Sequence, residues 1–185
     1  MVGAGIGMAR RLSEAMLGYL SRTLPVILGA LARRAEPRVS TLYRRVHPGQ
    51  LDLNGHMNQA CYAQVMELGR TDWLLGNGAW SMWRAAQIHP VVGEQRIVYR
   101  RELRLGQRFG VDSRVVDVEG RLMMFENVLF RGDVVHAVGT VGLLFIGPDG
   151  VLGRDAVERL AEPWRCDPVK LDQWRIMSRV PNQPA

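Results

Sequence analysis

One predicted helix limits how this chain can fold. Residues 58–75 carry apolar side chains at helical spacing, and the apolar face that they form is wide. The apolar positions are Cys61, Tyr62, Val65, Met66, Leu68, Gly69 and Trp73. Since such a helix presents apolar surface in several directions, it must be covered on more than one side. We therefore expect the rest of the chain to wrap around it.

Strands are predicted on both sides of this helix in the sequence. One short strand is expected before it, at residues 41–47. After Pro90 the hydrophobic period changes to two, and we predict strands at residues 97–103, 109–118, 122–130 and 134–146. The links between these four strands are short, which favours antiparallel neighbours throughout. Short helices are expected at residues 82–87 and 154–161.

This order predicts an α+β protein with a hotdog fold. In that fold a curved antiparallel sheet wraps around one long central helix, and here an extra amphipathic helix precedes it. A ferredoxin-like fold is disfavoured because it needs a second long helix between its strands. We expect three parts: a basic helical arm at residues 1–40, the hotdog domain at 41–165, and an irregular tail at 166–185.

Charge is distributed unevenly along the 185 residues. The net charge is +6, and residues 1–45 alone hold eight arginines against two glutamates. The basic and acidic side chains of residues 46–185 cancel, so a neutral body argues against a nucleic-acid partner. The two cysteines are too few for a disulfide scaffold or a four-cysteine zinc site, and we expect no metal.

The arm contains a helix predicted at residues 7–34 with an apolar stripe. Its longest uncharged run, residues 23–32, is too short to span a bilayer. Arg22 inside the apolar stretch argues against a secretory signal peptide. Two readings remain open: peripheral contact with an anionic membrane, or packing on the body or on a partner subunit. We predict a cytoplasmic protein whose arm can meet the inner face of the membrane.

Polar residues cluster in the loop that leads into the central helix. Asp52, Asn54, His56 and Asn58 lie there, close to helix N-terminal amides that lack partners inside the helix. Such amides polarise a carbonyl oxygen, while a carboxylate activates water or attacks directly. Structural roles compete with this interpretation. Asp52 or Asn54 can stabilise a turn, Asn58 can cap the helix, and His56 can be a hydrogen-bonded structural histidine.

The pattern also resembles a known family. Leu51-Asp52, His56-x-Asn58-x-Ala60-x-Tyr62 and Glu67-x-x-Arg70 resemble the opening motif of the hotdog acyl-CoA thioesterases, of the 4-hydroxybenzoyl-CoA thioesterase type and most of all its long-chain acyl-CoA branch. The resemblance continues in Ile97-x-Tyr99-Arg100-Arg101 and Leu105-Gly106, and covers residues 43–146. Glu67 and Arg70, three residues apart, are otherwise a local ion pair.

The resemblance implies hydrolysis of a fatty (medium- or long-chain) or aromatic acyl-CoA without a cofactor. Asp52 takes the place of the family's general base or nucleophile, and Glu67 is a second acidic candidate. The full catalytic set is Asp52, His56, Asn58 and Glu67. Substrate binding is assigned to Gly55, Met57, Gln59, Tyr62, Arg100 and Arg101, the arginines being suited to the phosphates of coenzyme A.

The family also implies a homodimer or homotetramer with active sites at subunit interfaces. This chain departs from the branch at Gln59, where a second Asn is usual, at Cys61, where Arg is common, and at Gly69, where Ala is common. Two other functions compete with hydrolysis. One is a hotdog enoyl-thioester hydratase or dehydratase, whose motif is longer by one residue and contains a proline. The other is a non-catalytic protein that binds acyl chains or a membrane.

Overall fold

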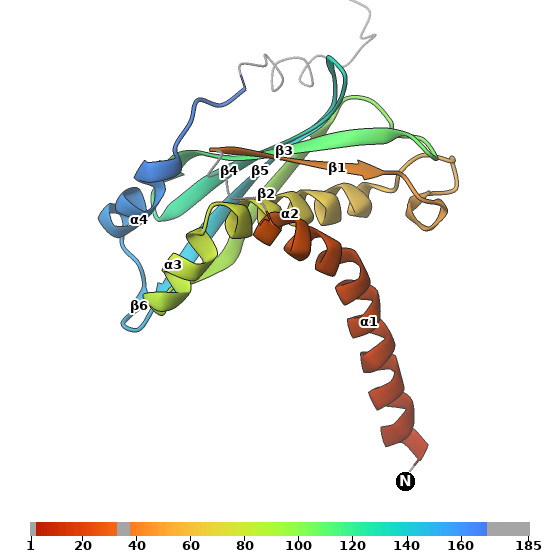
Figure 1. The fold of residues 1–185 in the computed structure, drawn as a ribbon, viewed down its shortest axis with the longest axis horizontal. Helices are drawn as coiled ribbons and strands as arrows, with labels where there is room; N and C mark the ends of the chain where they lie inside the picture. The colour runs from red at the N-terminus through yellow and green to blue at the C-terminus, as the bar shows by residue number, and fades with distance from the viewer. Residues whose placement is uncertain (1–2, 33–37, 170–185) are drawn as a thin grey trace, which may run out of the picture.

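A curved antiparallel sheet lies over one long helix in the computed structural model of the chain (Figure 1), which describes residues 3–32 and 38–169, with side chains from Leu17 onward. The strands are β1 (Val39–Arg45), β2 (His89–Tyr99), β3 (Arg108–Glu119), β4 (Leu122–Arg131), β5 (Val134–Gly147) and the short β6 (Gly150–Val151). Their order is β1-β3-β4-β5-β2, with β6 beside β5 and every neighbouring pair antiparallel. The predicted hotdog fold is confirmed.

The central helix α2 (Gln59–Gly76) is buried along most of its length, as its broad apolar face predicts. Near its start Tyr62, Val65 and Met66 enter one apolar cluster with Phe109 and Leu129 of the sheet. Further along, Trp73 packs in a second cluster, where its ring meets that of Phe125 edge to face at 5.0 Å between centroids. The sheet therefore covers the helix from one end to the other.

Gly69 lets α2 approach the sheet closely. A Cβ atom at this position would lie 2.6 Å from the Ser113 hydroxyl and 2.9 Å from Cγ1 of Val111, both on β3. No side chain fits in that space without moving its neighbours. Beside this contact, Arg70 donates a 3.1 Å hydrogen bond to Asn127, whose amide donates to Ser113 at 2.7 Å. The buried polar groups of this contact thus bond one another.

The prediction that β2 and β3 are antiparallel neighbours is wrong. β2 pairs with β5 at one edge of the sheet, whereas β3 lies beside β1 at the other side. Residues 100–107 cross between them. The amides of Arg100 and Arg101 still bond to His136 on β5, but the rest of the segment bonds to residues before α2. The amide of Met57 donates to the Leu103 carbonyl at 2.7 Å, and that of Gly106 donates to Val46 at 2.9 Å. A short link of this kind therefore does not force its two strands together.

The predicted position of β2 is also wrong in large part, because the strand spans His89–Tyr99 rather than residues 97–103. The other boundaries differ less, and the short helix α3 spans Ala79–Ala85 rather than 82–87. The helix expected at 154–161 is α4 (Arg154–Ala161), and two short 3₁₀ helices, η1 (Pro48–Gln50) and η2 (Glu162–Trp164), also occur. The predicted tail lies outside the described residues from position 170 onward.

The N-terminal helix α1 (Gly3–Ala32) rests one side of its C-terminal half on α2. Thr23, Val26 and Ala30 are buried on that side, at 3%, 3% and 1% exposure. The opposite side is a stripe of exposed leucines, formed by Leu17, Leu20, Leu24, Leu28 and Leu31, which are 44–64% exposed. Among the described helices none is long and apolar enough to cross a membrane.

The close contact at Gly69 predicts a large effect of a small substitution. Gly69→Ala should lower the free energy of unfolding by about 1–3 kcal/mol because its methyl group collides with β3. Gly76→Ala is the matched control, since nothing lies within 4 Å of a Cβ at the end of the same helix. That variant should be neutral or gain up to about 1 kcal/mol. Urea unfolding followed by tryptophan fluorescence measures both, and equal stabilities would contradict the packing described.

Candidate functional site

The loop before α2 is closed by its own backbone. The Asp52 amide donates to the His56 carbonyl at 2.8 Å, and the Gly55 amide donates back to the Asp52 carbonyl at 3.1 Å. Gly55 has a φ of +73°, the left-handed region in which a glycine is favoured. A bridge between Leu51 and Met57 holds the two ends of the loop together. The loop therefore places Asp52 in one defined position ahead of the helix.

The Asp52 carboxylate has a structural role in this loop. Its Oδ1 accepts hydrogen bonds from the amides of Asn54 at 2.9 Å and His56 at 3.2 Å. These bonds stabilise the turn, as expected for the structural role that the sequence analysis set beside a catalytic one. Both bonds fall on the same oxygen, and Asp52 is only half-buried. The second carboxylate oxygen is thus left for other partners.

Asn58 caps the helix, which is the structural role predicted for it from the sequence. Its side-chain oxygen accepts the Ala60 amide at 2.9 Å, and its carbonyl accepts the Cys61 amide at 2.9 Å. Asn58 is therefore the N-cap of α2. In the described part of the chain, the Gln59 amide makes no hydrogen bond, so this first-turn amide stays available to a ligand.

The crossing segment supplies the opposite wall of the site. Leu103 accepts the Met57 amide through its carbonyl, and its own amide donates to the Tyr62 hydroxyl oxygen at 3.1 Å. The Tyr62 ring meets the Tyr99 ring edge to face at 5.1 Å, and the Tyr99 hydroxyl donates to the Gln59 carbonyl at 3.4 Å. These contacts bring the end of β2 to the N-terminus of α2.

Between the loop and this wall lies a pocket of about 380 Å³, called here the Asp52 pocket. It brings together seven predicted site residues: Asp52, His56, Met57, Gln59, Tyr62, Arg100 and Arg101. It also contains Tyr99 and Glu102, to which the sequence interpretation assigned no role. Tyr99 directly precedes Arg100 and Arg101 in the sequence. This position beside two predicted binding residues is the signal that could have identified it. Only the fold shows that the segment faces Asp52.

The three other predicted residues lie outside this pocket. Gly55 forms the exposed tip of the loop, and Asn58 is occupied as the helix cap. Glu67 lines a separate hollow of about 180 Å³ between α1 and α2, together with Tyr19 and Arg22. Within one copy of the chain, Glu67 and Asp52 are therefore in different pockets.

The environment of the Asp52 pocket favours the protonated form of its tyrosine hydroxyl groups. Burial raises the pKa of Tyr62, and nearby acidic groups, including Asp52, add to this effect. Burial likewise raises the pKa of Tyr99. Burial also raises the pKa of the Cys61 thiol, which keeps it protonated and a poor nucleophile. No three His, Cys, Asp or Glu residues among those described are grouped to hold a metal ion.

A comparison of the sequence with protein families gives the identification. The profile of the thioesterase-like superfamily matches residues 46–161, which is more than half of the chain. The chain belongs to this superfamily. The match includes the Asp52 loop, α2 and the whole sheet except β1.

Solved structures of low sequence identity share the fold. A probable thioesterase from Escherichia coli, YbaW, superposes with a TM-score of 0.60 at 22% identity, over 66% of this chain and 98% of that one. SAV2348 from Staphylococcus aureus, solved in complex with CoA, gives 0.62 at 15% identity, over 83% and 100%. Slr0204 from Synechocystis, a 1,4-dihydroxy-2-naphthoyl-CoA thioesterase, gives 0.57 at 12% identity, over 70% and 96%.

The bond between Tyr62 and the crossing segment can be tested by its removal. Tyr62→Phe leaves the buried Leu103 amide without its acceptor, which should cost about 1–3 kcal/mol of unfolding free energy. Tyr43→Phe, at an exposed tyrosine, is the control and should change stability by less than about 0.5 kcal/mol. Chemical denaturation compares them. Equal stability of the two variants would show that this bond does not hold the wall of the pocket.

Proposed function

We propose that this protein is an acyl-CoA thioesterase with Asp52 as its reactive carboxylate. The arrangement of the Asp52 pocket is the main support for this proposal. Asp52, which has one carboxylate oxygen free of the loop's bonds, and Gln59, which has an open amide at the start of α2, both line it. An amide at a helix N-terminus stabilises negative charge on a carbonyl oxygen, and a carboxylate activates the attacking group.

The reaction follows from these two groups. Asp52 takes a proton from water as the water oxygen attacks the thioester carbonyl carbon, and the Gln59 amide donates to the oxyanion that forms. When the carbonyl re-forms, the carbon–sulfur bond breaks and the thiolate takes the proton, giving a free acid and coenzyme A. Alternatively, Asp52 attacks the carbonyl carbon itself, the carbon–sulfur bond breaks to release coenzyme A, and water then hydrolyses the mixed anhydride to the free acid and the Asp52 carboxylate. His56 and the Tyr62 and Tyr99 hydroxyl groups are placed to shape the pocket around the thioester.

The substrate class is a fatty or an aromatic acyl-CoA. Among the structural neighbours, one was solved with CoA and another is a thioesterase of an aromatic CoA ester, which supports a CoA thioester here. Arg100 and Arg101 at the pocket provide positive charge for CoA phosphates. We also propose that Glu67 is a second catalytic acidic group, which acts in the active site of a second subunit.

We also propose a homodimer or homotetramer. β2 is an edge strand of the sheet, and its exposed Val91 and Val92 are apolar side chains suited to burial against a second copy. A second copy there would extend the sheet and remove the open edge from water.

Replacement of Asp52 tests the chemistry directly. Asp52→Asn keeps an oxygen for the Asn54 and His56 amides, so the fold should persist, but it removes the negative charge. We expect thiol release from acyl-CoA to fall by about 10²–10⁴-fold. Asp133→Asn, in the exposed β4–β5 turn, should retain wild-type rates. Undiminished hydrolysis by Asp52→Asn across a panel of fatty and aromatic acyl-CoA esters would overturn the assignment.

A single turnover in ¹⁸O-labelled water separates the two mechanisms. Label in the Asp52 carboxylate shows that Asp52 is the nucleophile and that water opens the anhydride at the aspartyl carbon. A general base leaves all of the label in the released acid, and trapping of the anhydride with hydroxylamine distinguishes this case from opening at the acyl carbon.

The leucine stripe of α1 supports a second proposal: that the protein is cytoplasmic and makes peripheral contact with an anionic membrane. The stripe leaves five leucines at helical spacing exposed, and residues 1–34 carry five arginines against one glutamate. An apolar stripe on a basic helix is the pattern of helices that lie at a lipid interface. Each leucine buried there contributes at most about 1.5–3 kcal/mol.

Vesicle flotation tests this contact. The variant Leu24→Gln with Leu28→Gln should lose most binding to phosphatidylglycerol vesicles, whereas Leu105→Gln, at an equally exposed leucine outside α1, should retain it. Raised salt should weaken wild-type binding, since the arginine attraction is screened. Wild-type flotation by the double variant would refute the proposal, and so would a concentration-dependent dimer, lost in that variant, in place of vesicle binding.

A further inference from the structure

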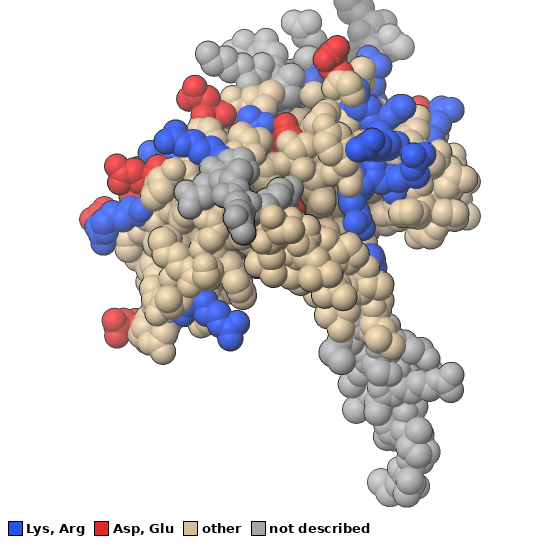
Figure 2. All heavy atoms as spheres, viewed as in Figure 1, with Lys and Arg blue, Asp and Glu red and all other residues tan. Residues whose placement is uncertain are grey.

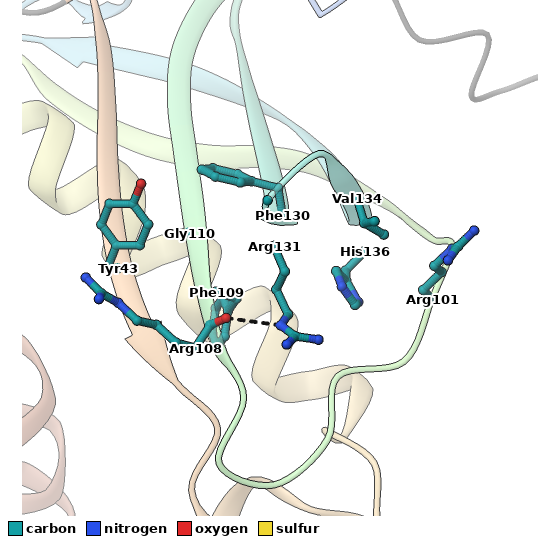
Figure 3. A pocket seen from close by; sticks show the side chains of 10 residues that line it. Tyr43, Arg101, Arg108, Phe109, Gly110, Phe130, Arg131, Val134 and His136 are labelled. Atoms are coloured by element: carbon teal, nitrogen blue, oxygen red, sulfur yellow. Dashed lines mark hydrogen bonds between the residues drawn. The ribbon is translucent and has the colours of Figure 1, made fainter.

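A second pocket, of about 790 Å³, lies on the outer face of the sheet and is called here the outer pocket (Figure 3). Along β3, Phe109 and Val111 join the apolar cluster around α2. Because side chains alternate along a strand, Gly110 between them faces the other way. Its register partners Tyr43 on β1 and Phe130 on β4 also line the outer pocket. This pocket is therefore on the opposite side of the sheet from α2.

The floor of the outer pocket depends on the absence of a side chain at Gly110. A Cβ there would lie 2.5 Å from Cζ of Phe130, so the Phe130 ring occupies the space above the glycine. Tyr43 meets this ring edge to face at 6.3 Å. Two aromatic rings thus form an apolar surface that is open to a planar ligand.

Positive charge surrounds these rings. The Arg108 guanidinium lies 4.8 Å from the centre of the Tyr43 ring, and Nε of Arg131 donates to the Arg108 carbonyl at 3.2 Å. Figure 3 shows Arg131 in the middle of the pocket, between Arg108 and His136, and Arg101 at its rim. Among the residues that the structure describes, no carboxylate lines the pocket. The arginines therefore present a net positive charge to any ligand.

The basic surface extends beyond the outer pocket. An adjoining hollow shares Tyr43 and Arg108 and adds Arg44, Arg45 and His47. Figure 2 shows basic side chains gathered at the end of the molecule where β1 ends. In a body whose residues 46–185 carry no net charge, this is a local concentration of charge suited to a polyanion.

Residues 100–102 connect the outer pocket to the Asp52 pocket. Arg101 lines both pockets. The His136 carbonyl, on β5, accepts the amides of Arg100 and Arg101 at 2.8 and 3.1 Å, and its ring Nδ1 donates to the Glu102 carbonyl at 3.1 Å. A carbonyl only accepts, so Nδ1 carries the hydrogen. His136 thus holds the wall between the two pockets in place.

We infer that the outer pocket binds the phosphorylated nucleotide end of the thioester substrate. Guanidinium groups of Arg108 and Arg131 pair with phosphate oxygens, and the adenine ring packs on Phe130. The pantetheine arm then passes Arg101 to bring the thioester to Asp52. This inference rests on the proposed thioesterase function and adds where the nucleotide is held.

The test uses the whole protein with two matched thioesters. Arg108→Gln and Arg131→Gln should each raise the KM for an acyl-CoA about tenfold, with kcat changed by less than about twofold. The same acyl group on pantetheine, which lacks the nucleotide, should be hydrolysed by these variants at the wild-type rate. Arg84→Gln, at an exposed arginine on α3, is the control and should match the wild type with both substrates.

Direct binding separates this inference from the proposed function. Calorimetry with adenosine 3′,5′-bisphosphate should show binding that is weakened about tenfold or more in the two outer-pocket variants and unchanged in Asp52→Asn. That result supports the nucleotide site even if no thioester is hydrolysed. Wild-type bisphosphate affinity in the variants overturns it, and so does equal loss with the pantetheine ester. Inorganic pyrophosphate binding as tightly as the bisphosphate would reject the adenine contact.

Discussion

The close packing of α2 against the sheet is the constraint on which the other features depend. At Gly69 the helix backbone comes so near β3 that a methyl group has no room, and Arg70, Asn127 and Ser113 bond one another beside this contact. With the helix fixed in this way, its N-terminus has one position relative to the strands. The loop that carries Asp52 is attached to that N-terminus, so its position is fixed as well.

The Asp52 pocket forms where two backbone segments meet without the regular hydrogen bonds of paired strands. Met57 donates to Leu103, which in turn donates to Tyr62, and these bonds join the loop, the helix and the crossing segment. The structural role of Asp52 uses only one of its two carboxylate oxygens. Oδ1 closes the turn, and the chemistry that we propose uses the other oxygen.

The two faces of the sheet differ in what they can bind. The inner face is apolar and covered by α2, whereas the outer face carries aromatic rings and arginines around Gly110. His136 belongs to the boundary between them. Burial lowers its pKa, which favours the neutral ring that donates through Nδ1 to the Glu102 carbonyl. The helix α1 covers the Glu67 side of α2 and leaves its own leucines exposed.

By itself the sequence determined the central helix, the strands, the hotdog class and the Asp52 motif, because periodicity and turn residues act over a few neighbouring positions. It also indicated both roles of the polar loop, the turn at Asp52 and the cap at Asn58. Tertiary structure alone decided that residues 100–107 cross the sheet instead of turning back. The reason is that their backbone partners, Val46 and Met57, are distant in sequence. The same crossing brings Tyr99 and Glu102 to Asp52 and gathers Tyr43, Arg108 and Arg131 into one pocket. Glu67 instead lies in the hollow between α1 and α2. Such groupings depend on which strands become neighbours, and no local pattern specifies that.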